Sequence, residues 1–208
     1  MGWPHLLRAE VAVFVLCLAG VVVYAVFISA PLKELANPLI PENPAKAPWY
    51  FLGLQELVSY SAFMGGVGLR SVALLGLALI PYLDREKRYV GIWFSNRQGW
   101  LVALGSLIVG AAALIGLLAF TVNFGWFRNW WPGIPQLIIV AINPGTLWVG
   151  FVMAWSLLVL YQTGSTRMGA IALFSLFLIS YLIFTYVGTE LRGPNWEFFW
   201  SKSQWPIH

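Results

Sequence analysis

The side chains best suited to hold a small molecule lie between the first two apolar runs of the chain. Prolines at positions 38, 41, 44 and 48 precede the aromatic run Trp49-Tyr50-Phe51. The residues that follow predict an amphipathic helix that ends near Tyr60. Because proline fixes the backbone, such a segment loses little freedom when it binds a ligand. We expect residues 36–60 to lie at one membrane face and to shape a pocket there.

The residues that redox chemistry requires are sparse. The two histidines, His5 and His208, lie near the two ends of the chain. A b-type haem needs axial ligands inside a helix bundle, most often histidines, so we expect no haem bound by this chain's own histidines. The single cysteine, Cys17, excludes an internal disulfide and a cysteine-held iron–sulfur cluster. An autonomous redox enzyme or hydrolase is therefore not expected.

The composition is that of an integral membrane protein. Hydrophobic residues make up 60% of the chain, charged residues 10%, and the mean hydropathy is +0.77, which a soluble domain does not show. The net charge of +4 is typical of membrane-protein loops rather than of nucleic-acid binding. Carboxylates do not line any apolar run, which argues against a proton channel or an ion-coupled transporter.

Five apolar runs are long enough to be considered as membrane spans, since a helix crosses the hydrocarbon core in about 20 residues. Backbone groups in lipid must be bonded internally, so we predict an all-α membrane protein, with a short interfacial helix after the first span. Residues 134–142 are too short to cross and form either an interfacial segment or an extension of the fourth span. The first run is a retained anchor rather than a cleaved signal. The expected spans are Val11–Ser29, Val67–Leu83, Trp100–Val122, Thr146–Tyr161 and Ala170–Val187.

Orientation follows from the loops. The densest basic cluster, residues 84–88 with Arg97, favours the cytoplasmic side. Five spans then place the N-terminus in the cytoplasm, and the proline-rich segment and the C-terminus in the periplasm. Basic residues divide six against six between the two sides, so only loop density supports this orientation. Tryptophans 126, 130 and 131, and again 196, 200 and 205, fall on the outer side, where they form either an aromatic belt or a docking surface for a partner.

The proline-aromatic segment resembles the outer quinol-site loop of the cytochrome b family. That family has an Ala-Asn-Pro-Leu run followed by Pro-Glu-Trp-Tyr at the start of a surface helix. Ala36–Leu39 matches the first run, Ala47–Leu52 aligns with the second, and Gly65–Val67 and Leu79–Leu83 resemble the two ends of the next span. The resemblance covers roughly Val11 to Val122. It is to the C-terminal part of cytochrome b, which also exists as a separate haem-free chain called subunit IV.

One position departs from the family pattern. The family glutamate, which is assigned a role in taking a proton from quinol, aligns with Pro48, and proline has no acid–base group. The nearest carboxylate on the following helix is Glu56, seven residues after Trp49 and so about two turns further on nearly the same face. Glu56 is therefore the candidate proton acceptor. Its alternative role is a carboxylate at headgroup level that only solvates or caps the helix, and Glu42 is a weaker candidate.

The resemblance also implies a function. The chain would be a haem-free, non-autonomous subunit of a quinol:cytochrome c reductase in the inner membrane of a bacterium, forming part of the outer quinol-oxidation site. Menaquinol is the expected substrate. The implied partners are a haem-binding cytochrome b subunit, a Rieske iron–sulfur protein, a c-type cytochrome and lipids, in a dimeric complex. The residues expected to line the quinol pocket are Pro48, Trp49, Tyr50, Phe51, Leu54 and Gln55.

The resemblance divides the chain into two regions. Residues 1–122 correspond to the subunit IV-like region, with the quinol-site loop at 36–60. Residues 123–208 add two spans and a periplasmic tail, and the stretch from Gly188 to Trp196 is similar to the Arg-Gly-containing end of some bacterial reductase membrane subunits.

Two other functions stay open. The chain could be a scaffold subunit of another respiratory or photosynthetic complex that lacks a working quinol site, or a small transporter or assembly factor. For Trp49 and Tyr50 the alternative role is anchoring at the membrane interface.

Overall fold

The structure is a computed structural model that describes residues 3–29, 35, 45–84, 94 and 97–206, without the side chain of residue 128. The chain forms two compact units, Met1–Glu42 and Asn43–His208. The first unit contains helix α1 (His5–Phe27), all of whose residues are exposed. The candidates in residues 36–44, Glu42 among them, and the basic residues 85–88 lie outside the described residues. The division into regions 1–122 and 123–208 stays a prediction.

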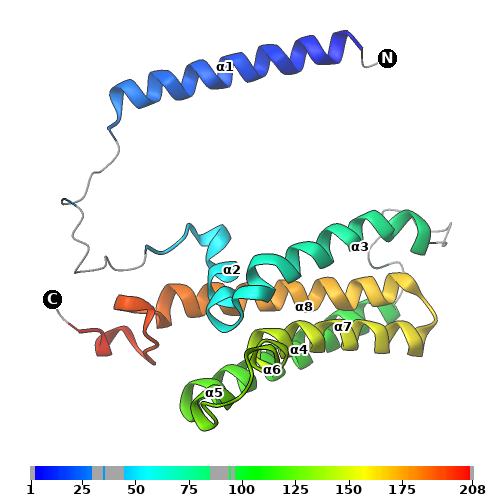
Figure 1. Cartoon of the computed structure of the whole chain (residues 1–208). Helices are drawn as coiled ribbons and strands as arrows, with labels where there is room; N and C mark the ends of the chain where they lie inside the picture. The colour runs from blue at the N-terminus through cyan, green and yellow to red at the C-terminus, as the bar shows by residue number, and fades with distance from the viewer. Residues whose placement is uncertain (1–2, 30–34, 36–44, 85–93, 95–96, 207–208) are drawn as a thin grey trace. The chain divides into compact units, whose positions relative to one another are not determined.

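The second unit contains the remaining helices (Figure 1). Five helices in the described part of the whole chain are long and apolar enough to cross a membrane, judged by length and composition. The expected all-α fold with five spans is therefore confirmed. The helices of the second unit are α2 (Trp49–Tyr60), a π-helical turn (Met64–Gly68), α3 (Leu69–Leu83), α4 (Arg97–Phe124), α5 (Phe127–Trp130), α6 (Gln136–Ile142), α7 (Pro144–Thr163) and α8 (Thr166–Tyr186), which a second π-helical turn continues through Leu191.

The helix ends lie close to those expected from hydropathy, with two differences. Helix α1 begins at His5, six residues before the expected span, so this histidine is the first residue of a membrane-length helix rather than a residue outside it. Residues 136–142 form a helix of their own. Asn143 separates it from α7, because its side chain accepts a hydrogen bond from the Thr146 amide at 2.8 Å and Pro144 follows as the first helical residue, a typical helix start.

Helices α4, α7 and α8 pack as a three-helix bundle. Its core contains Leu114 and Leu118 of α4, Trp148 of α7 and Phe184 of α8. Polar side chains join the helices, as is common in membranes: the Trp148 indole donates to the Ser180 hydroxyl, and the Trp155 indole donates to the Ser106 hydroxyl, both at 3.0 Å. Gly110 allows close approach, because a Cβ there would lie 2.4 Å from Leu176.

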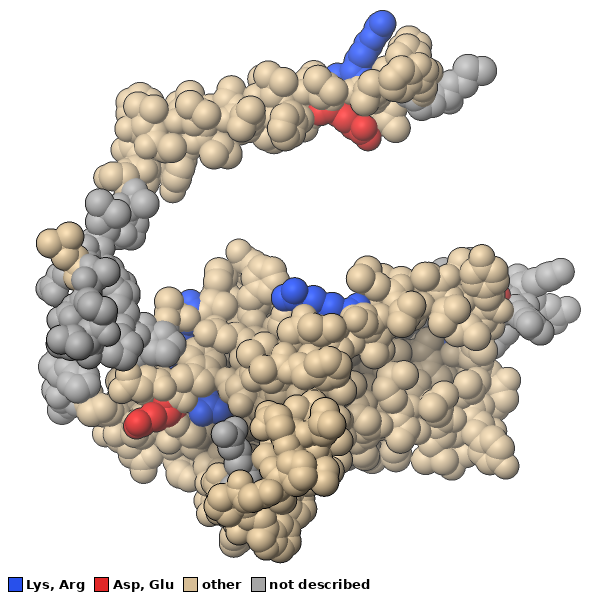
Figure 2. Space-filling model, viewed as in Figure 1, with Lys and Arg blue, Asp and Glu red and all other residues tan. Residues whose placement is uncertain are grey.

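Helices α2 and α3 differ in how much they are covered. Helix α2 packs its buried face against α8 and the π-helical turn that follows α8. By contrast, every residue of α3 is exposed or half-buried within this unit. On the face drawn in Figure 2, charged side chains form only small patches on an otherwise uncharged surface. An uncovered, largely apolar helix of this length requires lipid or another chain around it.

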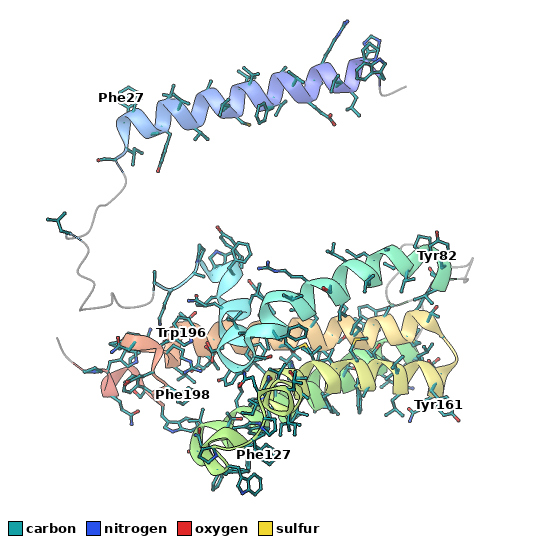
Figure 3. The ribbon with its side chains drawn as sticks, viewed as in Figure 1. Phe27, Tyr82, Phe127, Tyr161, Trp196 and Phe198 are labelled. Carbon is teal, nitrogen blue, oxygen red and sulfur yellow. The ribbon has the colours of Figure 1, made fainter. Side chains whose placement is uncertain are left out.

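Ion pairs lie at two ends of the second unit. At one end Arg167, at the start of α8, forms an ion pair with Asp84, which ends α3, with the nearest atoms 3.3 Å apart. At the other end lie Lys46, Arg192 and Lys202, near α2 and the C-terminal segment. Figure 3 shows Trp196 and Phe198 at this second end and Tyr82 and Tyr161 at the first. The assignment of these two ends to the two sides of a membrane stays a prediction.

Candidate functional site

Helix α2 has two different faces. Leu52, Glu56 and Leu57 on one face are buried in the second unit. Trp49, Tyr50 and Phe51, in the first turn, are 68%, 55% and 54% exposed. The three rings contact each other in sequence, at centroid distances of 5.7 and 5.2 Å. The predicted amphipathic helix is thus present, and its first turn presents three adjoining aromatic rings outward.

Pro48, Gln55 and Leu54, the other residues predicted to line the pocket, make contacts within the chain that differ from one another. Pro48 is exposed and caps the start of α2, with the amides of Phe51 and Leu52 donating to its carbonyl. Gln55 accepts a hydrogen bond from the Ala47 amide at 2.7 Å and donates to the Ala45 carbonyl at 3.1 Å. Its amide therefore holds the segment before α2 in place. Leu54 is half-buried. The assignment of these residues to a quinol pocket stays a prediction.

Glu56 lies inside the unit and is fully buried. Both of its carboxylate oxygens accept hydrogen bonds from Arg192. The Arg192 Nε atom donates to Oε2 at 3.0 Å, and Nη2 donates to Oε1 at 2.8 Å. Bidentate arginine–carboxylate pairs of this kind are among the strongest polar contacts in proteins. The role of Glu56 as proton acceptor stays a prediction, but its carboxylate is not free to meet a ligand in this structure.

Arg192 has three further neighbours. Its Nη2 atom also donates to the Tyr60 hydroxyl at 3.2 Å, and its Nη1 atom donates to the Trp196 carbonyl at 2.9 Å. The guanidinium lies 5.7 Å from the ring centroids of both Tyr60 and Phe198, which is within cation–π range. Arg192 therefore joins α2 to the segment that follows α8.

The C-terminal hook, defined as residues 192–199, folds back so that the Trp196 carbonyl meets the Arg192 side chain. Its ends are tied by an antiparallel bridge between Arg192 and Phe198. Asn195 and Trp196 both have positive φ, +55° and +62°. Asparagine tolerates this conformation and tryptophan does so at a cost. The indole of Trp196 then donates to the Ser59 hydroxyl of α2 at 2.6 Å, a second link between hook and helix.

The charges around the pair affect two pKa values. Burial, followed by the charge of Glu56, raises the pKa of Tyr60 well above its ordinary value. Burial alone lowers the pKa of Arg192, but the hydrogen bonds and charge of Glu56 outweigh it, so that the pKa of Arg192 is raised. At neutral pH the Tyr60 phenol therefore stays protonated and Arg192 stays charged.

A second polar contact lies on the outer surface of the same end. Lys46 donates to the Thr189 carbonyl at 3.1 Å and lies 4.9 Å from the centroid of the Trp205 ring. Lys202 forms an exposed ion pair with Glu190 at 2.7 Å. Burial, with the nearby charge of Lys202, lowers the pKa of Lys46. These contacts hold the segment before α2 and the chain's end against the π-helical turn after α8.

Two apolar hollows of about 290 and 370 Å³ lie between α4 and α8. The larger reaches the hook at Phe198 and Trp200. The linings of both lack the residues predicted for the quinol pocket. Among the described residues no group of three or more His, Cys, Asp or Glu side chains is placed to hold a metal ion.

Arg192, Tyr60 and Trp196 belong to this site, and sequence reasoning did not assign them to it. One signal was available in the sequence. A carboxylate and an arginine that are buried in an apolar protein are expected to form an ion pair. Because Arg192 follows Glu56 by 136 positions, however, the pairing follows from the packing of α2 on α8 and not from any local pattern.

Fold and site together define a multi-pass, all-α membrane protein with an exposed aromatic turn and a buried ion pair at one end. Comparison with known proteins adds a relationship. The chain is 29% identical over 123 residues to the menaquinol:cytochrome c reductase cytochrome c subunit of Geobacillus thermodenitrificans, covering 55% of this chain and 46% of that one. It is 28% identical over 123 residues to the protein of the same name from Bacillus subtilis strain 168, covering 55% and 45%.

The chain therefore spans about half the length of the curated relatives that it matches. No family model matches the chain, and no solved structure matches it. The relatives agree with the expected class of complex, a quinol:cytochrome c reductase. They are named as cytochrome c subunits, so the resemblance to subunit IV stays a proposal.

Proposed function

We propose that this chain is a haem-free membrane subunit of a menaquinol:cytochrome c reductase, and that α2 forms part of its outer quinol-oxidation site. The single observation that carries the proposal is the aromatic first turn of α2. Trp49, Tyr50 and Phe51 are mostly exposed although the helix that bears them is firmly held. The partial similarity to two menaquinol:cytochrome c reductase subunits supports the same assignment.

In this proposal the aromatic turn is half of a pocket. Small-molecule sites are mostly apolar with a few placed polar groups, and the rings would pack against the quinol ring while Leu54 and Gln55 border it. Pro48 starts the helix rigidly and does no acid–base chemistry. The other wall would come from a haem-binding cytochrome b subunit, because the aromatic face is open in this chain.

Quinol oxidation releases two protons and two electrons. In the proposed complex the electrons leave to redox centres of partner chains, a Rieske iron–sulfur protein and a b haem, with a c-type cytochrome further along. The protons leave at the outer face of a bacterial inner membrane. This chain would supply shape, hydrogen bonds and one carboxylate. Its N-terminus would be cytoplasmic and its C-terminus periplasmic, and the complex would be a dimer with bound lipids.

Glu56 is the proposed proton acceptor, which requires a rearrangement. Because both carboxylate oxygens are bonded to Arg192, proton uptake would have to separate a buried ion pair, and that is costly. The same observation favours the second candidate function, a scaffold subunit without a working quinol site. In the scaffold, Glu56 and Arg192 would serve only to hold α2 on α8.

The experiment that tests the quinol site uses the purified complex and menaquinol as the reductant. We expect Tyr50→Ala to lower kcat/KM about tenfold, which corresponds to about 1.4 kcal/mol of lost interaction. Tyr82→Ala is the matched control, since Tyr82 is also an exposed tyrosine but lies in the last turn of α3, far from α2 along the chain. Equal kcat/KM for the two variants, with unchanged haem content, would favour the scaffold function instead.

A further inference from the structure

We infer that Arg192 is a positioning residue for the quinol site, acting through Glu56 to fix the orientation of α2. The inference rests on the proposed function, which gives the exposed turn of α2 its substrate. Arg192 itself touches no residue of the aromatic turn in the described structure. Its effect would pass through the helix, because α2 is one rigid element of 12 residues.

The first step is the geometry of the guanidinium. Arg192 makes hydrogen bonds through all three of its nitrogens, two of them to Glu56 and the third to the Trp196 carbonyl. Five N–H groups in a fixed plane make this fork directional, which a lysine cannot reproduce. The contact with the Tyr60 hydroxyl adds a second attachment to α2, one turn beyond Glu56. The fork therefore fixes both the position and the rotation of the C-terminal half of α2.

The second step is burial. Glu56 is fully buried and the Arg192 side chain is 12% exposed. A charge in such a place is held strongly by its partner, because separation would leave each ion without water or counterion. The ion pair between Lys202 and Glu190 in the same segment is 56% and 36% exposed, and exposed pairs of this kind contribute little. The Glu56–Arg192 pair thus differs from the Lys202–Glu190 pair in burial and not in distance.

The third step connects the pair to the aromatic turn. Tyr50 lies six residues before Glu56, which is about 9 Å along the helix axis. The N-terminal half of α2 makes one polar contact with α8, from the Tyr181 hydroxyl to the Trp49 carbonyl at 3.4 Å, and packs on α8 through Gly53. Rotation of α2 about its axis would swing the exposed rings, and it is opposed by this packing and by the buried ion pair at Glu56.

The hook completes the arrangement. It brings the Trp196 carbonyl to Arg192 and the Trp196 indole to Ser59 of α2. Gly193 lies in the fold of the hook, where a Cβ would come within 2.7 Å of the Phe199 ring. The segment after the last span thus returns to α2 and contacts it at Glu56, Ser59 and Tyr60.

The test compares four variants in the assembled complex: Arg192→Gln, Glu56→Gln, the double variant, and Lys202→Gln as the matched control. Two readouts are measured, KM and kcat for menaquinol, and hydrogen–deuterium exchange of the α2 amides. We expect Arg192→Gln to raise KM and to speed α2 exchange, each by about tenfold or more, because it leaves a buried unpaired carboxylate. Lys202→Gln should leave both readouts as in the wild type.

The double variant separates positioning from simple misfolding. Gln at both positions can hydrogen-bond without a buried charge, so we expect KM and exchange to return most of the way to the wild-type values. If Arg192→Gln matches Lys202→Gln in both readouts, the inference is overturned. If the wild-type complex does not oxidise menaquinol but Arg192→Gln still speeds α2 exchange, the quinol function fails while Arg192 remains the residue that positions α2.

Discussion

The carboxylate of Glu56 is fully buried and forms an ion pair with Arg192. This places two demands on one residue. As part of an ion pair it stabilises the contact between α2 and the hook, and as a proton acceptor it would have to leave that pair. The two roles predict different results when the carboxylate is replaced by an amide.

We expect Glu56→Gln to lower the thermal stability of the purified complex far more than Glu190→Gln. Breaking a buried pair costs about 3–5 kcal/mol, whereas breaking an exposed one costs about 0–1 kcal/mol. Differential scanning measurements in detergent provide the comparison. Equal unfolding temperatures for the two variants would contradict the importance of the buried pair.

The same variant tests acid–base chemistry through its pH profile. If Glu56 takes the quinol proton, Glu56→Gln loses most of kcat, and the pH dependence of the remaining rate changes. An unchanged rate and pH dependence would remove Glu56 as the proton acceptor. The double variant with Arg192→Gln is the control, since it restores the packing without restoring the carboxylate.

The raised pKa of Tyr60 predicts that the free energy of unfolding falls at alkaline pH. Burial and the charge of Glu56 raise the pKa of Tyr60 above its ordinary value of 10.0, so the folded protein keeps a proton that the unfolded chain releases above about pH 10. Stability is therefore fully present below about pH 10 and falls as the pH rises further. The lowered pKa of Lys46 acts in the opposite direction. We expect Tyr60→Phe to flatten the decline in unfolding temperature between about pH 9.5 and 11. The same slope in both proteins would contradict this assignment.

At the scale of elements, the junction between α2 and α3 depends on a tight contact. Gly65 lies in the π-helical turn before α3, and a Cβ there would lie 2.5 Å from the Val58 side chain and 2.9 Å from its backbone. Backbone atoms cannot move aside as a side chain can. Glycine at this position therefore lets the chain turn sharply from the surface helix into the next span.

We expect Gly65→Ala to destabilise this junction by about 1–3 kcal/mol, the usual cost of overpacking. Gly66→Ala is the matched control, because a Cβ at the neighbouring residue meets nothing within 4 Å and alanine favours helices. The thermal stability of the purified variants measures the difference. A Gly65→Ala protein as stable as Gly66→Ala would show that the contact relaxes freely.

The helices themselves could be largely predicted from the sequence, and the contacts between them could not. Span lengths follow from local hydropathy, and α2 shows the two faces that its pattern predicts. For Gln55, which is predicted to line the pocket, the sequence did not show that its amide bonds to the backbone before α2. A residue's type limits what it can bind, but its neighbours in space decide which of those bonds it makes.

At the scale of the whole molecule, the uncovered surfaces suggest that the chain works with others. Helix α3 has no buried residue among the residues described, and the two tryptophan groups include exposed rings at positions 130, 131 and 200. An aromatic belt and a docking surface both account for these rings. The proposed complex would cover part of this surface with a haem-binding subunit.

This arrangement predicts where haem absorbance will be found. We expect the purified complex to show the absorbance of b haem and the chain expressed alone to show none. In the proposal the haem ligands belong to a partner, and His5 stands at the first turn of α1. Reduced-minus-oxidised spectra of both preparations make the measurement, normalised to protein. A b-haem spectrum from the isolated chain would contradict the proposal that a partner subunit supplies the haem ligands.

The amino-acid sequence is enough to predict an all-helical membrane protein, the positions of its spans, and an aromatic turn at the start of the short helix after the first span. These properties are local, because hydropathy over about 20 residues decides membrane insertion and two turns suffice to define a helix face. The burial of Glu56 and its pairing with Arg192, 136 residues away, become visible only in the folded chain. Such a pairing depends on the crossing of α2 over α8 and on the fold of the hook, which no short segment of the sequence encodes.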